Sequence, residues 1–287
     1  MPSEDDRHPL TALPDDAPAG FRESLASRGA AVTRIMLDPP RTYVWAGGLG
    51  PHLFGWYSRA PEHAAMVEYE ARVREVVGSE LPLRTPPLID RGELWRLDRA
   101  IDPEPLQGAV AVEAVVEAVQ ALAGLRLPPS PPSLWKERKI KVLRRRLRTL
   151  RSPLPARDFL RARSLVSGSL LPRTTSHGDF HRGHVLPEGG LPWVIDWEGV
   201  AMRPAGFDLM RMWADIERRE DRDYLFEQAE RTVGRTYGRE LLKLRYALLV
   251  QAIATKFAEH AEYNRDPEGG RALLLLLPEV RREALAE

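Results

Sequence analysis

The sequence predicts an α+β protein of two lobes, a small β-rich lobe followed by a larger and mainly helical one. Three short segments between residues 31 and 57 are rich in β-branched and aromatic residues and are separated by turn signals, which is typical of antiparallel strands. After Asp102-Pro103, helical spacing of apolar residues replaces this strand chemistry. A length of 287 residues is enough for two such lobes with a cleft between them.

The small lobe is expected over residues 29–100, after a flexible N-terminal arm at residues 1–28. The arm is predicted because its sequence is acidic and rich in proline, a composition that disfavours a packed core. A helix should follow the third strand, because Pro61 suits a first helical turn and Met66 and Tyr69 lie on one helical face. The expected elements are strands at 31–37, 41–45 and 52–57, a helix at 61–77 and a hairpin within 88–97.

The large lobe is expected over residues 101–287 and consists mainly of predicted helices. Two short strand-like pieces flank the turn sequence Pro187-Glu188-Gly189-Gly190, which predicts a hairpin among these helices. The expected elements are helices near 110–125, 136–151, 156–166, 207–219, 225–236 and 240–264, and strands at 184–186 and 193–195.

The composition excludes several classes of site. The chain has no cysteine, so disulfides, thiolate metal sites and a cysteine nucleophile are excluded, and a reducing compartment suits the protein. It also lacks the Gly-x-Ser-x-Gly turn on which α/β-hydrolases carry their serine. The sequence has no run of eighteen apolar residues and no signal-peptide pattern at its N-terminus. We therefore expect a cytoplasmic protein without a membrane partner.

A strongly basic stretch stands out in a chain whose net charge is only +1. Nine positive side chains lie between Lys136 and Arg151, opposed by Glu137 alone. Apolar residues such as Ile140 and Leu147 recur along the stretch, so it can be the solvated face of an amphipathic helix. The same patch would suit an anionic acceptor substrate or an acidic partner protein. Nucleic acid is not favoured, because aromatic stacking residues are not interleaved along the run.

The residues that carry chemistry lie between Ser176 and Asp208. The sequence His177-Gly178-Asp179 places a carboxylate in a tight turn, where it can act on a substrate hydroxyl as a base or positioning group. The strand-like piece Trp193-Val194-Ile195 leads into a second carboxylate, Asp196, which can hold a divalent cation. The predicted hairpin between them brings both carboxylates to one edge of the fold. Phosphoryl transfer needs this pairing, because its catalysis rests on alignment and on neutralising phosphate charge with a metal.

These segments resemble the aminoglycoside phosphotransferase and choline kinase family, which has a two-lobed protein-kinase-like fold. Residues 177–186 resemble its catalytic loop, in which His-Gly-Asp is followed, after four residues, by Asn. Residues 194–198 resemble its metal-binding strand end, and residues 206–209 resemble the start of its next helix. The resemblance implies transfer of the γ-phosphoryl group of ATP or GTP to a hydroxyl group, with Mg²⁺ as the metal.

The resemblance also implies roles for single residues. Asp179, with His177 beside it, would be catalytic, and Asp196 would be a metal ligand. Position 184 would supply the second metal ligand, but it is His184 where the family has Asn. Imidazole matches magnesium less well than an amide oxygen does, because magnesium prefers oxygen donors. Asp208 is expected to hold the loop or begin a helix, and not to catalyse.

The small lobe departs from the family pattern in its charged residues. The family has a lysine on the third strand that binds the nucleotide phosphates, but the small lobe has no lysine, and Gly55 is the position expected for it. Glu70 matches the helix glutamate that would pair with that lysine. Arg41, His52 and Arg59 are candidates to supply the missing charge, because they lie nearby in the sequence.

The glycine-rich phosphate loop of the family is also missing from its expected place. The first strand turn reads Asp38-Pro39-Pro40-Arg41, which contains no glycine. The glycines within residues 47–50 come one turn later and suit a hairpin connection better than a phosphate loop.

Two functions remain open from the sequence. The first is an ATP-dependent phosphotransferase that acts on a small molecule or on the Ser or Thr of a peptide, as in relatives that modify natural products. The basic stretch favours an anionic or peptide acceptor. The second is a catalytically inactive relative that serves as a binding or scaffold subunit. The missing lysine, the missing loop and His184 motivate this alternative.

Overall fold

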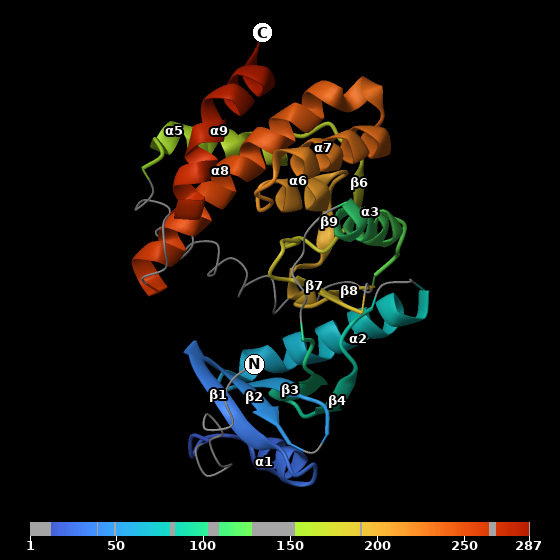
Figure 1. The fold of residues 1–287 in the computed structure, drawn as a ribbon, viewed down its shortest axis with the longest axis vertical. Helices are drawn as coiled ribbons and strands as arrows, with labels where there is room; N and C mark the ends of the chain where they lie inside the picture. Colours follow the sequence, from blue (N-terminus) through green and yellow to red (C-terminus); the bar gives the residue numbers. More distant parts are fainter. Residues whose placement is uncertain are drawn as a thin grey trace.

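The structure, a computed structural model, has the α+β fold with two lobes that the sequence predicts (Figure 1). The lobes are stacked along the long axis of the molecule, with the sheet of the small lobe at one end and the helices of the large lobe at the other. The structure describes residues 13–38, 40–48, 50–80, 84–102, 109–127, 153–189, 191–263 and 268–286. The basic stretch at 136–151 lies outside these described residues.

The small lobe is built on one antiparallel sheet with the strand order β1-β2-β3-β5-β4. Its register pairs Trp56 with Tyr43 on one side and with Arg96 on the other, so these three side chains share one face of the sheet. The strands are β1 (Ala31–Asp38), β2 (Arg41–Gly47), β3 (Leu53–Ser58), β4 (Leu88–Arg91) and β5 (Trp95–Arg99). Helix α2 (Ala64–Glu80) follows a 3₁₀ turn (Pro61–His63) and lies between the sheet and the large lobe (Figure 1).

A helix that the sequence analysis did not predict covers the other face of the sheet. In α1 (Ala19–Ala26), Phe21 and Leu25 are fully buried, and the Phe21 ring lies 5.5 Å from Tyr57 and 5.6 Å from Trp95. The prediction of a flexible arm over residues 1–28 is therefore wrong for residues 13–28, while residues 1–12 lie outside the described part. The proline-rich composition concealed a helical repeat in which Leu13, Ala17, Phe21 and Leu25 recur every four residues.

The large lobe consists of helices and two short antiparallel strand pairs. The predicted hairpin is confirmed as β7 (Val185–Glu188) and β8 (Leu191–Val194), and the pair of β6 (Arg173–Ser176) with β9 (Ala201–Pro204) was not predicted. The helix expected at 207–219 is wrong in its length, because α6 stops at Trp213 and α7 begins at Arg219. The helices are α3 (Ala109–Ala123), α5 (Ala156–Ser167), α6 (Phe207–Trp213), α7 (Arg219–Val233), α8 (Gly238–Tyr263) and α9 (Glu268–Leu285).

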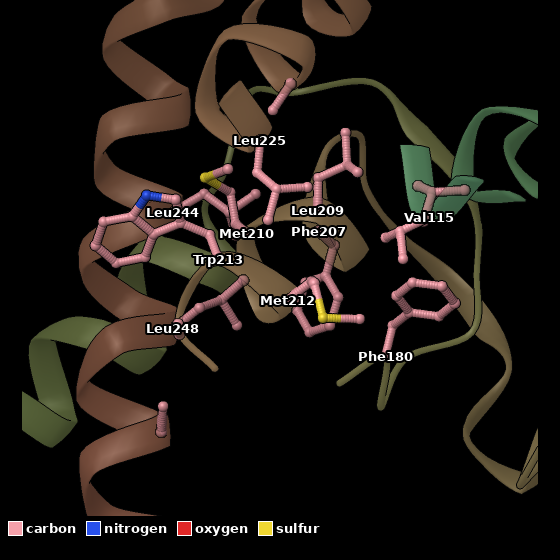
Figure 2. Close-up of a cluster of buried hydrophobic side chains, with 14 of the residues drawn as sticks. Val115, Phe180, Phe207, Leu209, Met210, Met212, Trp213, Leu225, Leu244 and Leu248 are labelled. Carbon is pink, nitrogen blue, oxygen red and sulfur yellow. The ribbon is translucent and has the colours of Figure 1, made fainter. Parts of the chain in front are cut away.

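The core of the large lobe reaches the loop between β6 and β7. Figure 2 shows Phe180 of that loop pointing toward Val115 of α3 and Met212 of α6, and only 1% of Phe180 is exposed. Burial of a phenylalanine of this kind stabilises by about 2–3 kcal/mol, so the loop is fixed by the core on which it lies. In the part of the chain that the structure describes, no helix is both long and apolar enough to cross a membrane.

Candidate active site

A cavity of about 510 Å³ lies between the small-lobe sheet and the hairpin β7–β8. Its small-lobe wall is aromatic, because alternate residues of β2 and β3 turn the same face toward it. The rings of Tyr43 and Phe54 are stacked there with their centroids 6.2 Å apart. The opposite wall is polar. The lining residues that matter for chemistry are Arg41, Tyr43, Trp45, Phe54, Trp56, Glu70, Arg96 and Asp98 on one side and His184, Asp196 and Glu198 on the other.

The turn that carries Asp179 depends on Gly178. Its backbone has φ +84°, a conformation that residues with a Cβ rarely adopt. A Cβ at this position would also collide with the carbonyl oxygen of Gly199. The chain therefore passes close to the 3₁₀ turn Trp197–Gly199, which follows Asp196, and this approach brings the two predicted carboxylates to one side of the fold.

Asp208 holds the turn in place from the start of α6. Its carboxylate accepts hydrogen bonds from the Ser176 hydroxyl (2.8 Å), the His177 amide (2.7 Å) and the Gly178 amide (3.0 Å). Burial raises the pKa of Asp208, although these three hydrogen bonds oppose the rise. The expected structural role of Asp208 agrees with this geometry.

His177 does not face the cavity, which corrects its proposed catalytic role. Its side chain is fully buried, and its Nε2 lies 2.9 Å from the carbonyl oxygen of Ile195, to which it donates. Its ring packs against Trp197 at a centroid distance of 4.9 Å. Burial, assisted by the nearby His184, lowers the pKa of His177 to about 4. His177 is thus a neutral residue that positions the strand end before Asp196.

Asp179 reaches the surface beside two imidazoles. Its side chain is 35% exposed, and Arg211 of α6 places Nη2 3.5 Å from its Oδ1. One ligand atom each from Asp179, His181 and His184 lie within 4.8 Å of one another. Asp179 is therefore partly exposed and lies beside two other groups that can donate to a metal ion or exchange a proton.

Asp196 lies on the opposite side of His184 from Asp179. Its Oδ2 is 3.4 Å from His184 Nε2, and its backbone has φ 62°, an unusual conformation for a residue with a side chain. Burial and the nearby Glu198 raise the pKa of Asp196 to about 7, although His184 and Arg41 lower it. The two carboxylates, Asp179 and Asp196, suit a divalent cation, but the imidazole between them does not suit Mg²⁺.

The predicted position of the missing lysine, Gly55, proves to be on the wrong face of the sheet. A Cβ at Gly55 would lie 2.8 Å from the Arg96 carbonyl oxygen and 2.8 Å from the ring of Phe21, on the side that α1 covers. Residues that face the cavity from this strand are Phe54 and Trp56. A lysine on β3 that reached the cavity would have to replace one of these two aromatic residues.

Arg96, on the neighbouring strand β5, supplies the cation that the sequence analysis missed. It pairs with Glu70 of α2, and its Nε lies 3.0 Å from Asp98. Its guanidinium carbon lies 5.7 Å from the ring centroid of Trp56. Burial alone would raise the pKa of Glu70, but Arg96 and Arg74 outweigh it and hold that pKa below its ordinary value. Glu70 thus has a cationic partner at the cavity.

The sequence carried a signal for Arg96. The segment Trp95-Arg96-Leu97-Asp98 alternates apolar and charged residues, which is typical of a strand with one polar face. Arg96 and Asp98 are 8% and 2% exposed, so this face is buried and polar, a combination that marks functional sites. The same pattern is equally typical of a hairpin that closes the lobe, so alternation alone does not single out Arg96.

Of the three residues proposed to supply the missing charge, only Arg41 lies at the cavity. Arg41 lines the cavity, where Nη2 lies 2.7 Å from Glu198 Oε2 and the guanidinium stacks on Trp56 at 5.0 Å from the ring centroid. His52 lies beside Gly47 and does not line the cavity, so its predicted binding role is not supported.

Arg59 and the glycines of the β2–β3 turn also lie away from the cavity. Arg59 pairs with Asp16, and its side chain is 63% exposed. A Cβ at Gly48 would lie 2.6 Å from the carbonyl oxygen of Gly29, so this turn packs on the end of α1. The glycines therefore form a hairpin connection, as expected, and do not cover the cavity.

Comparison with known proteins identifies related folds. A model of the phosphotransferase enzyme family matches residues 36–243. No curated protein sequence matches the chain. Among solved structures, a type I macrolide 2'-phosphotransferase superposes with a TM-score of 0.60 at 18% identity, covering 92% of this chain and 98% of that one.

Two further structures show the same likeness. A choline/ethanolamine kinase family protein from Mesorhizobium loti has a TM-score of 0.59 at 18% identity and covers 96% of each chain. A thermostable mutant of aminoglycoside phosphotransferase APH(4)-Ia, in a ternary complex with ADP and hygromycin B, has a TM-score of 0.56 at 13% identity and covers 92% of this chain and 98% of that one. At these identities the structural likeness is one of fold.

Proposed function

Because the chain belongs to the phosphotransferase enzyme family, we propose that it transfers the γ-phosphoryl group of ATP or GTP to a hydroxyl group of a small molecule. One observation carries the proposal: His184 and Asp196 line the cavity between the lobes, and Asp179 lies next to His184. His184 Nε2 is 3.4 Å from Asp196, and ligand atoms of His184 and Asp179 lie within 4.8 Å. Two carboxylates converging beside a nucleotide-sized cavity fit phosphoryl transfer, which depends on alignment and charge neutralisation.

Asp179 is the proposed catalytic residue. Its carboxylate would accept a hydrogen bond from the acceptor hydroxyl and orient it, or take its proton, as the phosphoryl group is transferred. His177 and Asp208 position Asp179 through the backbone of its turn. A divalent cation held by Asp196 and His184 would neutralise charge on the phosphates when bound.

The small lobe would bind the nucleotide with arginines in place of the family's lysine. Arg96 and Arg41 both lie over the Trp56 ring at the cavity, and guanidinium groups match phosphate oxygens in geometry. The stacked rings of Tyr43 and Phe54 offer an apolar surface for a purine. The pairing of Arg96 with Glu70 supports the catalytic proposal over the inactive scaffold, because it supplies the cation whose absence motivated that alternative.

For the acceptor substrate, we propose only a chemical class. A free hydroxyl on a small molecule is favoured, and a peptide Ser or Thr is the second possibility. Arg211 lies beside Asp179, and its positive charge would suit an acceptor that carries an anionic group near the reacting hydroxyl.

The function is tested by Asp179→Asn. This variant keeps the shape of the side chain and removes its charge, so phosphoryl transfer to a panel of alcohols should fall by about a hundredfold or more. Nucleotide binding, followed by thermal shift with ATP or GTP and a divalent cation, should remain. Phosphoryl transfer at the wild-type rate by Asp179→Asn would refute the catalytic role of Asp179. The absence of both a nucleotide shift and nucleotide consumption in the wild type would favour the scaffold.

The nucleotide site is tested by Arg96→Lys. Lysine keeps the positive charge but loses the planar fork, so the Kd for ATP should rise about tenfold, the loss of one charge-assisted hydrogen bond. Arg91→Lys is the matched control, because Arg91 lies on the adjacent strand β4 and outside the cavity. Equal affinities in the two variants would show that Arg96 does not bind the nucleotide.

A further inference from the structure

We propose that Asp179, His181 and His184, with Asp196 next to His184, form a site for a transition-metal ion of the Mn²⁺, Co²⁺ and Zn²⁺ class in preference to Mg²⁺. The inference deepens the proposed function, on which any role of this metal in phosphoryl transfer rests. The binding itself can be measured without nucleotide or acceptor.

The turn of the loop brings two imidazoles together. The His184 amide donates to the His181 carbonyl at 2.8 Å, which closes a tight turn over residues 181–184. The two ring centroids are consequently 3.9 Å apart. Asp179 adds a carboxylate, and one ligand atom from each of the three side chains falls within the 4.8 Å that a single ion can span. The set therefore contains nitrogen and oxygen donors, and is not merely a cluster of acids.

His184 is oriented as metal-binding histidines are. Its Nδ1 lies 2.8 Å from the carbonyl oxygen of Asp179, an acceptor only, so Nδ1 carries the proton and donates this bond. The lone pair of neutral His184 is therefore on Nε2. That atom faces Asp196, with Oδ2 at 3.4 Å. A backbone acceptor that fixes the tautomer in this way is the usual support of a metal-ligating imidazole.

The other two donor groups, His181 and Asp179, already have hydrogen-bond or ion-pair partners in the protein. The Gly183 amide donates to His181 Nδ1 at 3.1 Å, so neutral His181 carries its proton on Nε2. Binding through His181 requires it to exchange this bond or that proton. Arg211 lies 3.5 Å from Asp179 Oδ1, so an ion at the site shares this carboxylate with a guanidinium. We accordingly assign His184 as the principal imidazole ligand and His181 as the second.

The kinds of donor atom at the site determine which metal ion it prefers. Mg²⁺ demands oxygen ligands in near-octahedral geometry, whereas imidazole suits first-row transition ions. The family pattern has an amide oxygen at position 184, and this chain has a nitrogen whose orientation is fixed. Replacing that oxygen by nitrogen shifts the preference of the site away from Mg²⁺ and toward first-row transition ions.

The experiment measures metal binding to the metal-free protein in the absence of nucleotide. Mn²⁺ binding is followed by loss of the free-ion EPR signal, and Mg²⁺ and Zn²⁺ by competition. His184→Asn restores the amide oxygen and should lower the affinity ratio of Mn²⁺ to Mg²⁺ by about tenfold or more, the usual effect of altering a metal ligand or its support. His181→Ala should lower Mn²⁺ affinity without improving Mg²⁺ binding. His52→Asn controls for exposed histidine outside the cavity and should leave the ratio unchanged.

Several outcomes would overturn the inference. A wild-type ratio equal to that of His184→Asn, with both proteins folded by circular dichroism, would show that the imidazole does not set the preference. If His184→Asn does not fold, the inference is overturned when His181→Ala binds Mn²⁺ with the same affinity as the wild type. If the wild type transfers phosphoryl groups and still prefers Mg²⁺ to Mn²⁺, the metal assignment is refuted and the proposed function is intact. If the protein binds Mn²⁺ through these histidines but transfers no phosphoryl group, the proposed function is refuted and the metal assignment is intact.

Discussion

At the scale of single residues, the candidate site is held by groups that do not face it. Gly178 permits the turn, Asp208 accepts three hydrogen bonds from it, and buried His177 ties it to the strand end at Ile195. These residues hold the turn that carries Asp179, and the two polar side chains among them do so by pairing with buried backbone or hydroxyl groups. A buried polar network of this kind is costly to disturb, because each lost partner leaves a desolvated group unpaired.

Burial of His177 predicts that this residue contributes less to stability in mild acid than at neutral pH, whereas Asp196, whose pKa is raised to about 7, contributes in the opposite sense. The pKa of His177 is lowered to about 4 from an ordinary 6.5, so between these values the unfolded state binds more protons than the folded state. The stability that neutral His177 contributes is fully present above pH 6.5 and is lost as the pH drops toward 4. The shift corresponds to about 3 kcal/mol.

The measurement is urea unfolding between pH 4 and 8 for wild type and His177→Gln, which keeps a donor toward the Ile195 carbonyl. The curve of unfolding free energy against pH should be flatter for the variant across this window. Parallel curves would show that His177 does not carry the acid sensitivity.

At the scale of elements, helix α1 matters more than its sequence suggests. It covers the face of the sheet that looks away from the cavity, through Phe21 and Leu25, while Gly55 leaves room for the Phe21 ring. The sheet therefore has a core on the face that looks away from the cavity, and this core supports the aromatic wall from behind. The N-terminal segment from residue 13 belongs to the small lobe for this reason.

Phe21→Ala should consequently destabilise the protein by about 3–5 kcal/mol, the cost of a cavity in a closed core. The control is Glu23→Ala on the exposed side of the same helix, which should change stability by less than about 0.5 kcal/mol. Chemical denaturation of both variants gives the comparison. A Phe21→Ala protein as stable as its control would show that α1 is only loosely attached.

At the scale of the whole molecule, polar contacts join the lobes around the cavity. Glu70 of α2 accepts a hydrogen bond from the Trp197 amide at 3.2 Å, and Arg41 pairs with Glu198. Arg99 Nη2 lies 2.6 Å from Glu188 Oε2 at the connection between the lobes. Because Glu70 also pairs with Arg96, one buried carboxylate links the small-lobe cation to the segment after Asp196. The relative placement of nucleotide and metal would therefore depend on Glu70.

Glu70→Gln should lower the free energy of unfolding by about 3 kcal/mol, because it breaks a buried ion pair and leaves Arg96 with less compensation. It should also reduce the thermal shift that ATP produces. Glu68→Gln is the matched control on the same helix, since Glu68 is half exposed and its ion pairs with Arg72 and Arg91 contribute little. Equal losses in both variants would rule out a linking role for Glu70.

The sequence by itself determined the local features of this protein. The α+β class, the β7–β8 hairpin and the two carboxylates at 179 and 196 follow from turn residues, alternation and helical spacing, which act over a few neighbours along the chain. That Asp208 has a structural role was also predictable, because it sits at the start of a helix, but the turn it holds lies about thirty residues away in the chain.

Only the tertiary structure decided which residues share the cavity. Arg96 reaches the cavity and pairs with Glu70 because β5 lies beside β3 in the sheet, although about forty residues separate the two strands in the chain. Gly55 faces α1 because the side-chain period of a strand is two, so an error of one residue exchanges the faces. The burial of His177 and of α1 likewise depends on surfaces contributed by distant segments, which no local pattern records.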